Sequence, residues 1–594
     1  MVRILVAGLG AAAALHGAAL FASAQQSSRW EVPNPGVVYF LPESTAQIES
    51  DLRRIKAEGF KHVNIASWVW TLPHRGSELR RRVDFLLNWT DRNGLGVWLM
   101  HNIQYGNPRE AGDVEAAFGD PAAYVKPTVD PWVDALRGHP SVLGVQLGNE
   151  VGPHVPDGRN SPRYLAGFRR YLAESHGTIG NLNERWGTRY RSFGEISLPG
   201  ARDPGHADLQ RYARREFGRF YGSIFDQLFK PVLGRSLGYT VKTAADPFLF
   251  RAAPSFTVLG WDDMVANHPL WQLRVLADTD PRPTFNSEIH LYHDRFQYFP
   301  SEQRTRYRYL TDALMGQTMS SSFAWGSWSQ PAVAAVHRRT PATLAELERM
   351  GGVLRRFHLE ATRSRTAVLV TERHVEQGLA KVTENPALEG AYATLAATGR
   401  PWRFLLDGDL LAHAGQLDHL VVWSVDRIPL RTLQAMQVLP RSVRVHWMGP
   451  LPQWTEYGRP LPATTLNAVR ARVVHHTSPF ALTEGLADAG LPQRFRARTR
   501  ATYGWFSPER GSFTFGVEYP RLEVRRATAA DGSLLVALLN HGGDAVTIPA
   551  LASLPWYDAG RVRSVSDLTQ RAELGAGSLV LAPLDVRVLR YRYR

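Results

Sequence analysis

Residues 142–150 are Val-Leu-Gly-Val-Gln-Leu-Gly-Asn-Glu, and the fold of the first half of the chain follows from this stretch. Val142–Leu147 is a short apolar run, which is typical of a strand buried in a parallel sheet. Gly148 and then the polar pair Asn149-Glu150 come after it. The same order of apolar run, polar turn and amphipathic helix repeats from Gly36 onwards. Such a repeat indicates parallel β/α units.

Eight apolar runs predict eight strands, and helices fit between them. The strands are Val37–Phe40, His62–Ala66, Gly96–Met100, Val142–Leu147, Tyr239–Ala244, Thr257–Trp261, Thr284–Ser287 and Ser321–Ala324. The helices include Thr45–Glu58, Glu78–Asn93 and Leu209–Leu228. We therefore predict an α/β fold that begins with a (β/α)8 TIM barrel over residues 25–362, with long insertions.

The composition is that of a globular protein without cysteine chemistry. The chain has 594 residues, of which 44% are hydrophobic and 21% charged, and this composition excludes a mostly disordered or fibrous protein. The absence of cysteine excludes a disulfide framework, a thiol nucleophile and a zinc site with cysteine ligands.

The chain is strongly basic, with a formal net charge of +14 from 69 Lys and Arg against 55 Asp and Glu. Only six of the basic residues are Lys, and the arginines are scattered along the chain rather than gathered in one stripe. A nucleic-acid-binding surface needs such a stripe. We therefore expect no nucleic-acid partner.

The N-terminus has the pattern of an export signal. Arg3 supplies a positive charge, Ile4–Phe21 is apolar, and Ala22-Ser23-Ala24 forms a cleavage site of small residues. We predict a signal peptide over residues 1–24 and an exported protein, periplasmic or extracellular, with no stable membrane insertion after processing. The alternative is an uncleaved membrane anchor, because the apolar run approaches spanning length.

The ends of the predicted strands carry the chemistry-bearing side chains, as expected for a TIM barrel. They are Ser67-Trp68-Val69-Trp70, His101-Asn102, Asn149-Glu150, Asp246, Trp261-Asp262-Asp263, Glu288-Ile289-His290 and Trp325-Gly326-Ser327-Trp328. Carboxylates transfer protons and attack electrophiles, amides bind hydroxyl groups, and indole rings stack on sugar rings. Together these residue types predict a carbohydrate site at the mouth of the barrel.

Glu150 and Glu288 follow the fourth and seventh strands directly. These strands lie across the barrel mouth from each other, so two carboxylates at their ends can flank a glycosidic bond. Retaining glycosidases place such a pair about 5–5.5 Å apart. The alternative is that each glutamate caps a helix or forms a surface ion pair, but two glutamates at matching positions favour the catalytic pair.

Asn149-Glu150 and Glu288 resemble the paired sites of clan A, a group of retaining glycoside hydrolases. Residues 146–152, Gln-Leu-Gly-Asn-Glu-Val-Gly, resemble the acid/base segment of family 42 β-galactosidases. Within 168–196, the runs Leu182-Asn183-Glu184-Arg185-Trp186-Gly187-Thr188 and Phe193-Gly194-Glu195-Ile196 resemble a helical region of that family. Residues 258–262, Val-Leu-Gly-Trp-Asp, resemble its sixth strand.

The resemblance implies roles for individual residues. Glu150 would be the acid/base, Glu288 the nucleophile, and Asn149 a partner of the sugar 2-hydroxyl. Trp325 or Trp328 would form a sugar platform. We also expect substrate contacts from residues at the other strand ends, namely His101, Asn102, Trp68, Trp261, Asp262 and His290. For Asp262 the alternative is a helix cap, and His290 would contact substrate or orient Glu288.

The sequence also departs from the family pattern. Asp263-Met264 stands where family 42 members usually carry a tyrosine, and the loop 101–105 does not match. The four cysteines that hold zinc in many members are absent. His290, His293 and Asp294 lack a further ligand at defined spacing, so we predict no metal site and no cofactor. Lys242 and Asp246 would pair with each other or border the site.

The rest of the chain predicts two accessory modules. A second α/β module over 363–450 starts with the strand Thr366–Val370 and resembles the amidotransferase-like domain that family 42 enzymes use for trimer contacts. It lacks a cysteine nucleophile, which favours a structural role and a possible homo-oligomer. Residues 451–497 would connect it to a C-terminal β-sandwich over 498–594, where short alternating runs replace helical patterns.

These observations predict an exported, retaining, exo-acting β-glycosidase that hydrolyses terminal β-galactosides. Two alternatives stay open. The first is a related enzyme for β-mannosides, β-glucosides or an internal polysaccharide bond. The second is a non-catalytic carbohydrate-binding barrel.

Overall fold

The computed structural model describes residues 34–67, 77–103, 111–153, 161–263, 270–289, 302–325, 331–379, 386–486, 498–507 and 511–594. The predicted signal peptide at 1–24 lies outside these residues. The described part begins with eight strands: β1 (Asn34–Tyr39), β2 (His62–Ala66), β3 (Gly96–His101), β4 (Val142–Leu147), β5 (Gly238–Val241), β6 (Leu259–Asp263), β7 (Thr284–Ile289) and β8 (Met319–Trp325).

The eight strands form one parallel sheet in the order β5-β4-β3-β2-β1-β8-β7-β6. Because β1 pairs with both β2 and β8, the sheet curls round on itself. A single parallel bridge between Thr243 and Trp261 joins its two edges. The result is a nearly closed barrel, and the TIM-barrel prediction is confirmed.

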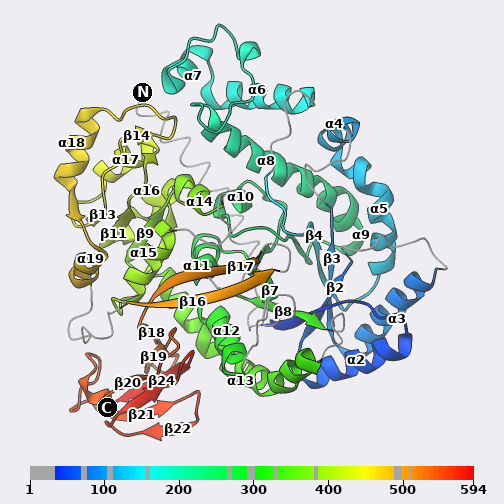
Figure 1. Ribbon diagram of the computed structural model, residues 1–594, viewed down its shortest axis with the longest axis vertical. Helices are drawn as coiled ribbons and strands as arrows, with labels where there is room; N and C mark the ends of the chain where they lie inside the picture. Colours follow the sequence, from blue (N-terminus) through cyan, green and yellow to red (C-terminus); the bar gives the residue numbers. More distant parts are fainter. Residues whose placement is uncertain are drawn as a thin grey trace.

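Helices surround the barrel, as Figure 1 shows. They are α2 (Thr45–Ala57), α3 (Glu78–Asn93), α5 (Pro121–Leu136), α8 (His206–Ile224), α11 (Leu270–Thr279), α12 (Glu302–Leu314) and α13 (Pro331–Thr362). Capping residues set their bounds. The side chain of Ser77 accepts a hydrogen bond from the Arg80 N–H at the start of α3, and Gly94 ends that helix with a left-handed φ of 65°.

Insertions between strands carry further short helices. They are α4 (Ala111–Gly119), α6 (Pro162–His176), α7 (Ile179–Trp186), the 3₁₀ turn η2 (Phe193–Glu195), α9 (Lys230–Leu233) and α10 (Pro247–Arg251). The predicted helix Leu209–Leu228 corresponds to α8 followed by a π-helical turn, η3 (Phe225–Phe229).

The N-terminal end of the barrel interior is filled. Trp98 packs there against Phe285, with ring centroids 4.7 Å apart. Gly144 and Gly238 make room for the Trp98 indole, because a Cβ on either glycine would come within 2.5 or 2.2 Å of its ring atoms. His62 lies in the same buried interior, where its ring nitrogens bond to Asn34 and Ser321 at 2.9 Å. The functional groups therefore lie at the opposite, C-terminal end.

Register shifts interrupt the pairing of the described barrel strands at three places. One lies near the N-terminal end, where Val97 and Trp98 of β3 pair with Val142 and Gly144 of β4. The other two lie near the mouth, on β7 and β8. On β7, the three-residue step from Asn286 to Ile289 pairs with the two-residue step from Trp261 to Asp263 on β6, so β7 carries one extra residue there. On β8, the three-residue step from Ser322 to Trp325 pairs with the two-residue step from Val37 to Tyr39 on β1, so β8 also carries one extra residue. An extra residue in a strand reverses which side chains beyond it point inward.

The second module is a parallel sheet in the order β10-β9-β11-β13-β15. Its elements are β9 (Thr366–Val370), α14 (Glu372–Leu379), α15 (Pro386–Ala396), β10 (Arg403–Leu406), η5 (Asp407–Asp409), α16 (Leu410–His413), η6 (Ala414–Gln416), β11 (His419–Trp423), α17 (Leu430–Gln437), β13 (Arg444–Met448), α18 (Ala463–Arg472), β15 (Val473–His476) and α19 (Pro479–Leu486). Two short strands, β12 (Arg427–Ile428) and β14 (Trp454–Thr455), pair beside it.

This module continues past residue 450, where we had predicted only a connecting segment. The strand β15 and the helices α18 and α19 lie within 451–497, and β15 is the fifth strand of the sheet. As an edge strand it is partly exposed, with Val474 49% exposed, so the region lacks the continuous apolar pattern of a buried strand.

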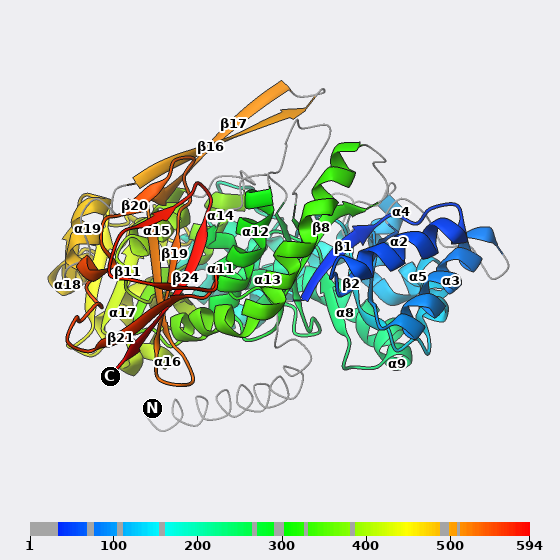
Figure 2. The same ribbon diagram turned by 90° about the horizontal axis from the view of Figure 1, so that it is seen from below.

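The C-terminal region is made of antiparallel strands. β18 (Glu523–Thr528), β19 (Leu534–Leu539), β24 (Val586–Tyr593), β21 (Val562–Asp567) and β22 (Ala572–Leu574) form one sheet. β20 (Val546–Ile548) pairs with β23 (Leu579–Leu581), their apolar side chains join the core of the larger sheet, and the 3₁₀ turn η8 (Leu551–Ser553) follows β20. A two-stranded ribbon of β16 (Arg498–Ser507) and β17 (Gly511–Pro520) extends from this region toward the barrel in Figure 2.

A buried polar cluster joins the three regions. Glu523 of β18 accepts hydrogen bonds at 2.8 Å from the Tyr392 hydroxyl of α15 and at 2.9 Å from the His541 Nε2. Nδ1 of His541 lies 2.5 Å from the Tyr307 hydroxyl of α12. Burial raises the pKa of Glu523, but Arg525 and His541 outweigh it and hold that pKa well below its usual range.

Over the described residues, no helix combines the length and hydropathy needed to cross a membrane.

Candidate active site

The bulge in β7 directs Glu288 into the barrel mouth. Asn286 points outward, where its amide donates to Asp312 of α12 at 3.1 Å. Strict alternation from Asn286 would turn Glu288 outward as well. Because Ser287 and Glu288 together occupy one inward position, the Glu288 side chain instead lies inside, and the residue is 2% exposed. The Ser287 hydroxyl fixes the bulge by donating to the Trp261 carbonyl oxygen at 3.1 Å.

The segment Gly148–Glu150 leaves β4 in a constrained conformation. Gly148 has a φ of 74°, and Glu150 has a φ of 53°, in the left-handed region that a residue with a side chain seldom adopts. Backbone N–H groups hold the segment from both sides: that of Gly148 donates to the His101 carbonyl at 2.8 Å, and that of Val151 donates to the Lys242 carbonyl at 3.0 Å. Such strain is retained where the surroundings impose it, and it is common at functional sites.

Lys242, directly after β5, lies between the two glutamates. Its Nζ is 2.7 Å from Oε1 of Glu288 and 3.6 Å from Oε1 of Glu150. It also donates a hydrogen bond to Oδ1 of Asn149 at 3.0 Å. The contact with Glu288 is short but lies outside hydrogen-bond angles, so its attraction is that of an ion pair. The structure thus brings Asn149, Glu150 and Glu288 together around one buried ammonium group.

The sequence interpretation missed these partners of Lys242. It left two alternatives for Lys242, a pair with Asp246 or a place at the border of the site. The contacts with Glu150 and Glu288 agree with the second, whereas Asp246 accepts a hydrogen bond from Arg214 at 2.9 Å and caps α10. A usable signal was present, because Gly238, Thr240 and Lys242 alternate along β5 and the first of these lies against Trp98 in the interior. Period-two alternation therefore carries Lys242 inward at the mouth.

His101 and Asn102 support the Asn149–Glu150 segment. The Asn102 side-chain oxygen accepts a hydrogen bond from the Asn149 N–H at 3.2 Å. The Ser67 hydroxyl donates to the Met100 carbonyl, so it accepts from Nδ1–H of His101 at 3.1 Å. Burial lowers the pKa of His101 to about 4, and its imidazole is therefore neutral at physiological pH.

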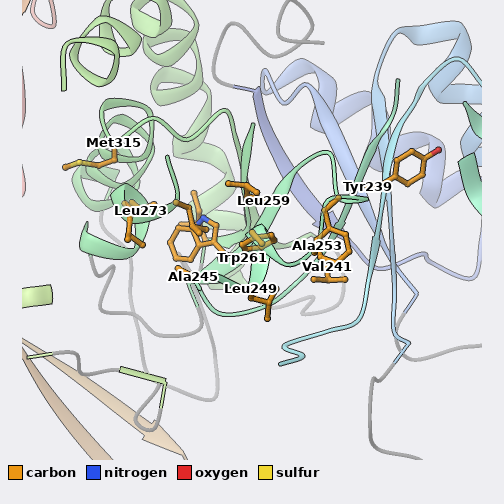
Figure 3. Close-up of a cluster of buried hydrophobic side chains, with 14 of the residues drawn as sticks. Tyr239, Val241, Ala245, Leu249, Ala253, Leu259, Trp261, Leu273 and Met315 are labelled. Carbon is orange, nitrogen blue, oxygen red and sulfur yellow. The ribbon is translucent and has the colours of Figure 1, made fainter. Parts of the chain in front are cut away.

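Trp261 is a core residue, and the expectation that it contacts substrate is wrong. It is fully buried, and its Nε1 donates to Oε1 of Gln317 at 3.0 Å. Figure 3 shows it among apolar side chains that include Leu249, Leu259 and Leu273. On β6 it follows Gly260, which faces the interior, because a Cβ added there would lie against Thr240 of the neighbouring strand. Side chains alternate along a strand, so the indole of Trp261 points away from the interior.

Trp325 is also not an open platform. It is the register partner of Tyr39, whose hydroxyl donates outward to Asp51 of α2. The bulge in β8 gives Trp325 the same outward direction, and its ring lies 5.2 Å from the Arg54 guanidinium at 5% exposure. Sequence alternation could not reveal this, because the extra residue in β8 reverses the facing.

Several predicted site residues cannot be placed. Trp68, His290 and Trp328 lie outside the described residues, as do His293 and Asp294. Asp262 and Asp263 lie on β6, but the positions of their side chains are not described. Within the described part of the chain, no group of three or more His, Asp or Glu side chains could hold a metal ion.

Comparison with known proteins supports the resemblance seen in the motifs. The β-galactosidase model of glycoside hydrolase family 42 matches residues 115–230, which include Asn149, Glu150 and the Leu182–Thr188 motif. Over this segment the chain is similar to family 42. A β-galactosidase of Thermus thermophilus is 29% identical to it over 194 residues, covering 28% of this chain and 30% of that protein. The chain thus aligns with less than a third of the length of the curated proteins it matches.

At the level of the fold, the similarity to solved structures covers nearly the whole chain. Gan42B, a GH42 β-galactosidase, has a TM-score of 0.66 at 12% identity, covering 95% of this chain and 98% of its own. The apo exo-carrageenase GH42 from Bacteroides ovatus has a TM-score of 0.64 at 15% identity, covering 95% and 82%. The barrel and the regions that follow it therefore share the architecture of these proteins.

Proposed function

We propose that the protein is an exported, retaining, exo-acting glycosidase that removes terminal β-galactosyl groups, with Glu288 as nucleophile and Glu150 as acid/base. The observation that carries the proposal is the shared contact with Lys242. Two oxygens that lie 2.7 and 3.6 Å from the same nitrogen are separated by at most the sum of these distances, about 6.3 Å. This limit admits the roughly 5–5.5 Å of retaining enzymes and falls below the roughly 6.5–9.5 Å of inverting ones.

The reaction would be a double displacement. In the first step, a carboxylate oxygen of Glu288 forms a bond to the anomeric carbon. The bond from that carbon to the leaving oxygen breaks, and Glu150 gives its proton to that oxygen. In the second step, water attacks the anomeric carbon, its proton passes to Glu150, and Glu288 leaves as a carboxylate.

The geometry of Asn149 fits the binding of a sugar hydroxyl. Lys242 donates to its Oδ1, so the Asn149 Nδ2 is the group left to donate to the substrate. The partly buried side chain lies beside both glutamates. In retaining enzymes a hydrogen bond to the 2-hydroxyl strengthens in the transition state.

The test is hydrolysis of a panel of aryl β-glycosides by the purified protein and its variants. We expect turnover of the β-galactoside, lost in Glu150→Ala and Glu288→Ala and kept in the matched control Glu348→Ala, whose side chain is 65% exposed on α13. Azide should restore cleavage of an activated substrate by Glu288→Gly. Full activity of Glu288→Ala would overturn the assignment.

The same panel addresses the alternatives. Turnover of a β-mannoside or β-glucoside instead would keep the mechanism and change the sugar. Because one solved neighbour is named an exo-carrageenase, carrageenan oligosaccharides belong in the panel beside neutral polysaccharides. Binding without turnover of any of these sugars would favour a non-catalytic barrel.

We further propose that the module beginning at β9 has an amidotransferase-like fold, that the C-terminal sheets form a β-sandwich and that the protein forms a homo-trimer through the former. The mass of the assembly in solution, measured by light scattering, tests the oligomer. Export predicts a mature N-terminus near Gln25, which N-terminal sequencing of the secreted protein would establish.

A further inference from the structure

We propose that Lys242 is a positioning residue that pairs with the two glutamates in turn, with Glu288 before the first displacement and with Glu150 after it. This inference rests on the proposed glycosidase mechanism. It assigns the buried lysine a defined task in each half of the reaction, and neither the motifs nor the comparisons assign it one.

The geometry places one cation against two carboxylates. The Lys242 side chain is 1% exposed, and that of Glu288 is 3% exposed. The side chain of Glu150, whose Oε1 lies 3.6 Å from the ammonium group, is 39% exposed. A buried ammonium group without a counter-charge is strongly destabilising, so Lys242 requires a carboxylate partner at every stage.

The proposed reaction supplies that partner throughout. Before the first displacement, Glu288 is the carboxylate and Glu150 holds the proton for the leaving group. Bond formation to the sugar turns Glu288 into a neutral ester, and proton donation turns Glu150 into a carboxylate. The negative charge therefore moves from Glu288 to Glu150, and the net charge of Lys242 and the two glutamates stays zero.

The transfer needs only a small displacement of the ammonium group. The lysine backbone is fixed, because the Lys242 carbonyl accepts a hydrogen bond at 3.0 Å from Val151, the residue after Glu150. Nζ is already 3.6 Å from Glu150, and the four-carbon lysine side chain can rotate at its end. The hydrogen bond to Asn149 Oδ1 at 3.0 Å can be kept while Nζ moves by this small amount.

Other described titratable groups of the mouth are otherwise engaged. Asp246 pairs with Arg214 and caps α10. His101, at the end of β3, is bonded to Ser67, and burial lowers its pKa to about 4, which keeps it neutral. Among the described titratable side chains, Glu288 from β7 and Glu150 after β4 each lie within 4 Å of the Lys242 Nζ.

The first test compares Lys242→Met, which removes the charge at similar length, with Lys242→Arg, which keeps it. In the methionine variant we expect the acid limb of the kcat/KM profile to move up by about 1–3 pH units, because Glu288 loses the cation that favours its ionised form. Single-turnover and burst kinetics with an activated aryl glycoside should show both displacements slowed at least tenfold. The arginine variant should keep the acid limb of the wild type.

An unchanged acid limb in Lys242→Met, with only KM altered, would overturn the proposal. If Lys242→Met does not fold, Lys242→Gln gives the same comparison with a neutral polar side chain. Circular dichroism and thermal unfolding of each variant establish that the fold is intact.

A second measurement does not depend on turnover. Infrared difference spectra between wild type and Glu288→Gln isolate the carboxyl band of Glu288, whose titration midpoint should move up in Lys242→Met. If the midpoint moves but no glycoside is cleaved, the proposed function fails and the effect of Lys242 on Glu288 stands. If both glutamates are essential for turnover but the midpoint stays fixed, the function stands and the inference about Lys242 fails.

Discussion

Nε of Arg214 lies 2.9 Å from Oδ2 of Asp246, and the two side chains are only 3% and 2% exposed. The other oxygen of Asp246 accepts the N–H groups of Phe248 and Leu249 at the start of α10. Arg214 also lies 3.7 Å from Glu372 of α14. This buried pair therefore fixes the loop that follows Lys242 and links the barrel to the second module.

Asp246→Ala should lower the free energy of unfolding by about 3–5 kcal/mol, because it leaves Arg214 buried without its partner and removes a helix cap. Urea unfolding followed by circular dichroism would measure the change. The matched control is Glu348→Ala, which breaks the exposed ion pair with Lys61 and should change stability by less than about 1 kcal/mol. Equal effects of the two substitutions would contradict the structural role of the buried pair.

The sequence predicted those elements whose signal is local. The strands His62–Ala66 and Val142–Leu147 and the helix Glu78–Asn93 appear with the predicted bounds, because an apolar run or a pair of caps defines each one. Glu150 and Glu288 also lie at the predicted mouth, since Glu150 follows β4 after Gly148 and Asn149, and Glu288 is the last residue but one of β7. These features depend on nearest neighbours along the chain.

The features that the sequence could not predict depend on neighbouring strands. Trp325 follows a bulge and the side chain of Glu288 lies in one. A bulge is defined by the register with the partner strand, which period-two alternation does not contain. The pairing of Lys242 with Glu288 was missed for a related reason: Asp246, one of the two alternatives for Lys242, is close in sequence, whereas Glu288 meets Lys242 only when the barrel closes. The same closure buries Trp261 against Gln317.

Trp261→Phe should lower the free energy of unfolding by about 1–3 kcal/mol, because Oε1 of Gln317 loses its buried donor. The KM for substrate should stay within about twofold of the wild type, since the indole does not reach the mouth. In a Gln317→Met background the same substitution should have a smaller effect, because no acceptor is left unpaired. A large rise in KM with unchanged stability would instead support the predicted contact of Trp261 with substrate.

Acid should destabilise the fold through buried neutral histidines. Burial lowers the pKa of His62 to about 3, below the roughly 6.5 of an unfolded chain. The unfolded state then binds more protons between these values, so the contribution of His62 is complete above pH 6.5 and falls as the pH drops toward 3. The slope is about 1.4 kcal/mol per pH unit for one histidine.

His62→Gln provides the measurement of this effect. The variant removes the titrating group, so its free energy of unfolding should fall less steeply between pH 6 and 4 than that of the wild type. Urea unfolding at a series of pH values gives both slopes. Parallel curves would show that His62 takes up a proton in the folded barrel.

Gly148→Ala should impair activity more than stability, because this glycine sets the path of the chain into Glu150. Its φ is 74°, and a Cβ there would come within 2.7 Å of Val151 and 2.8 Å of the Tyr221 hydroxyl. That hydroxyl is held by the Ile103 carbonyl at 2.6 Å, so the strain is relieved by movement of the Asn149–Glu150 segment.

Gly138→Ala is the matched control, with a similar φ of 78° and nothing within 4 Å of the added Cβ. Both variants should lose about 1–2 kcal/mol from the left-handed backbone alone. Only Gly148→Ala should also lower kcat, by at least tenfold, because an acid/base displaced by about 1 Å can cost a hundredfold in rate. Equal kcat values in the two variants would show that the position of Glu150 does not depend on this turn.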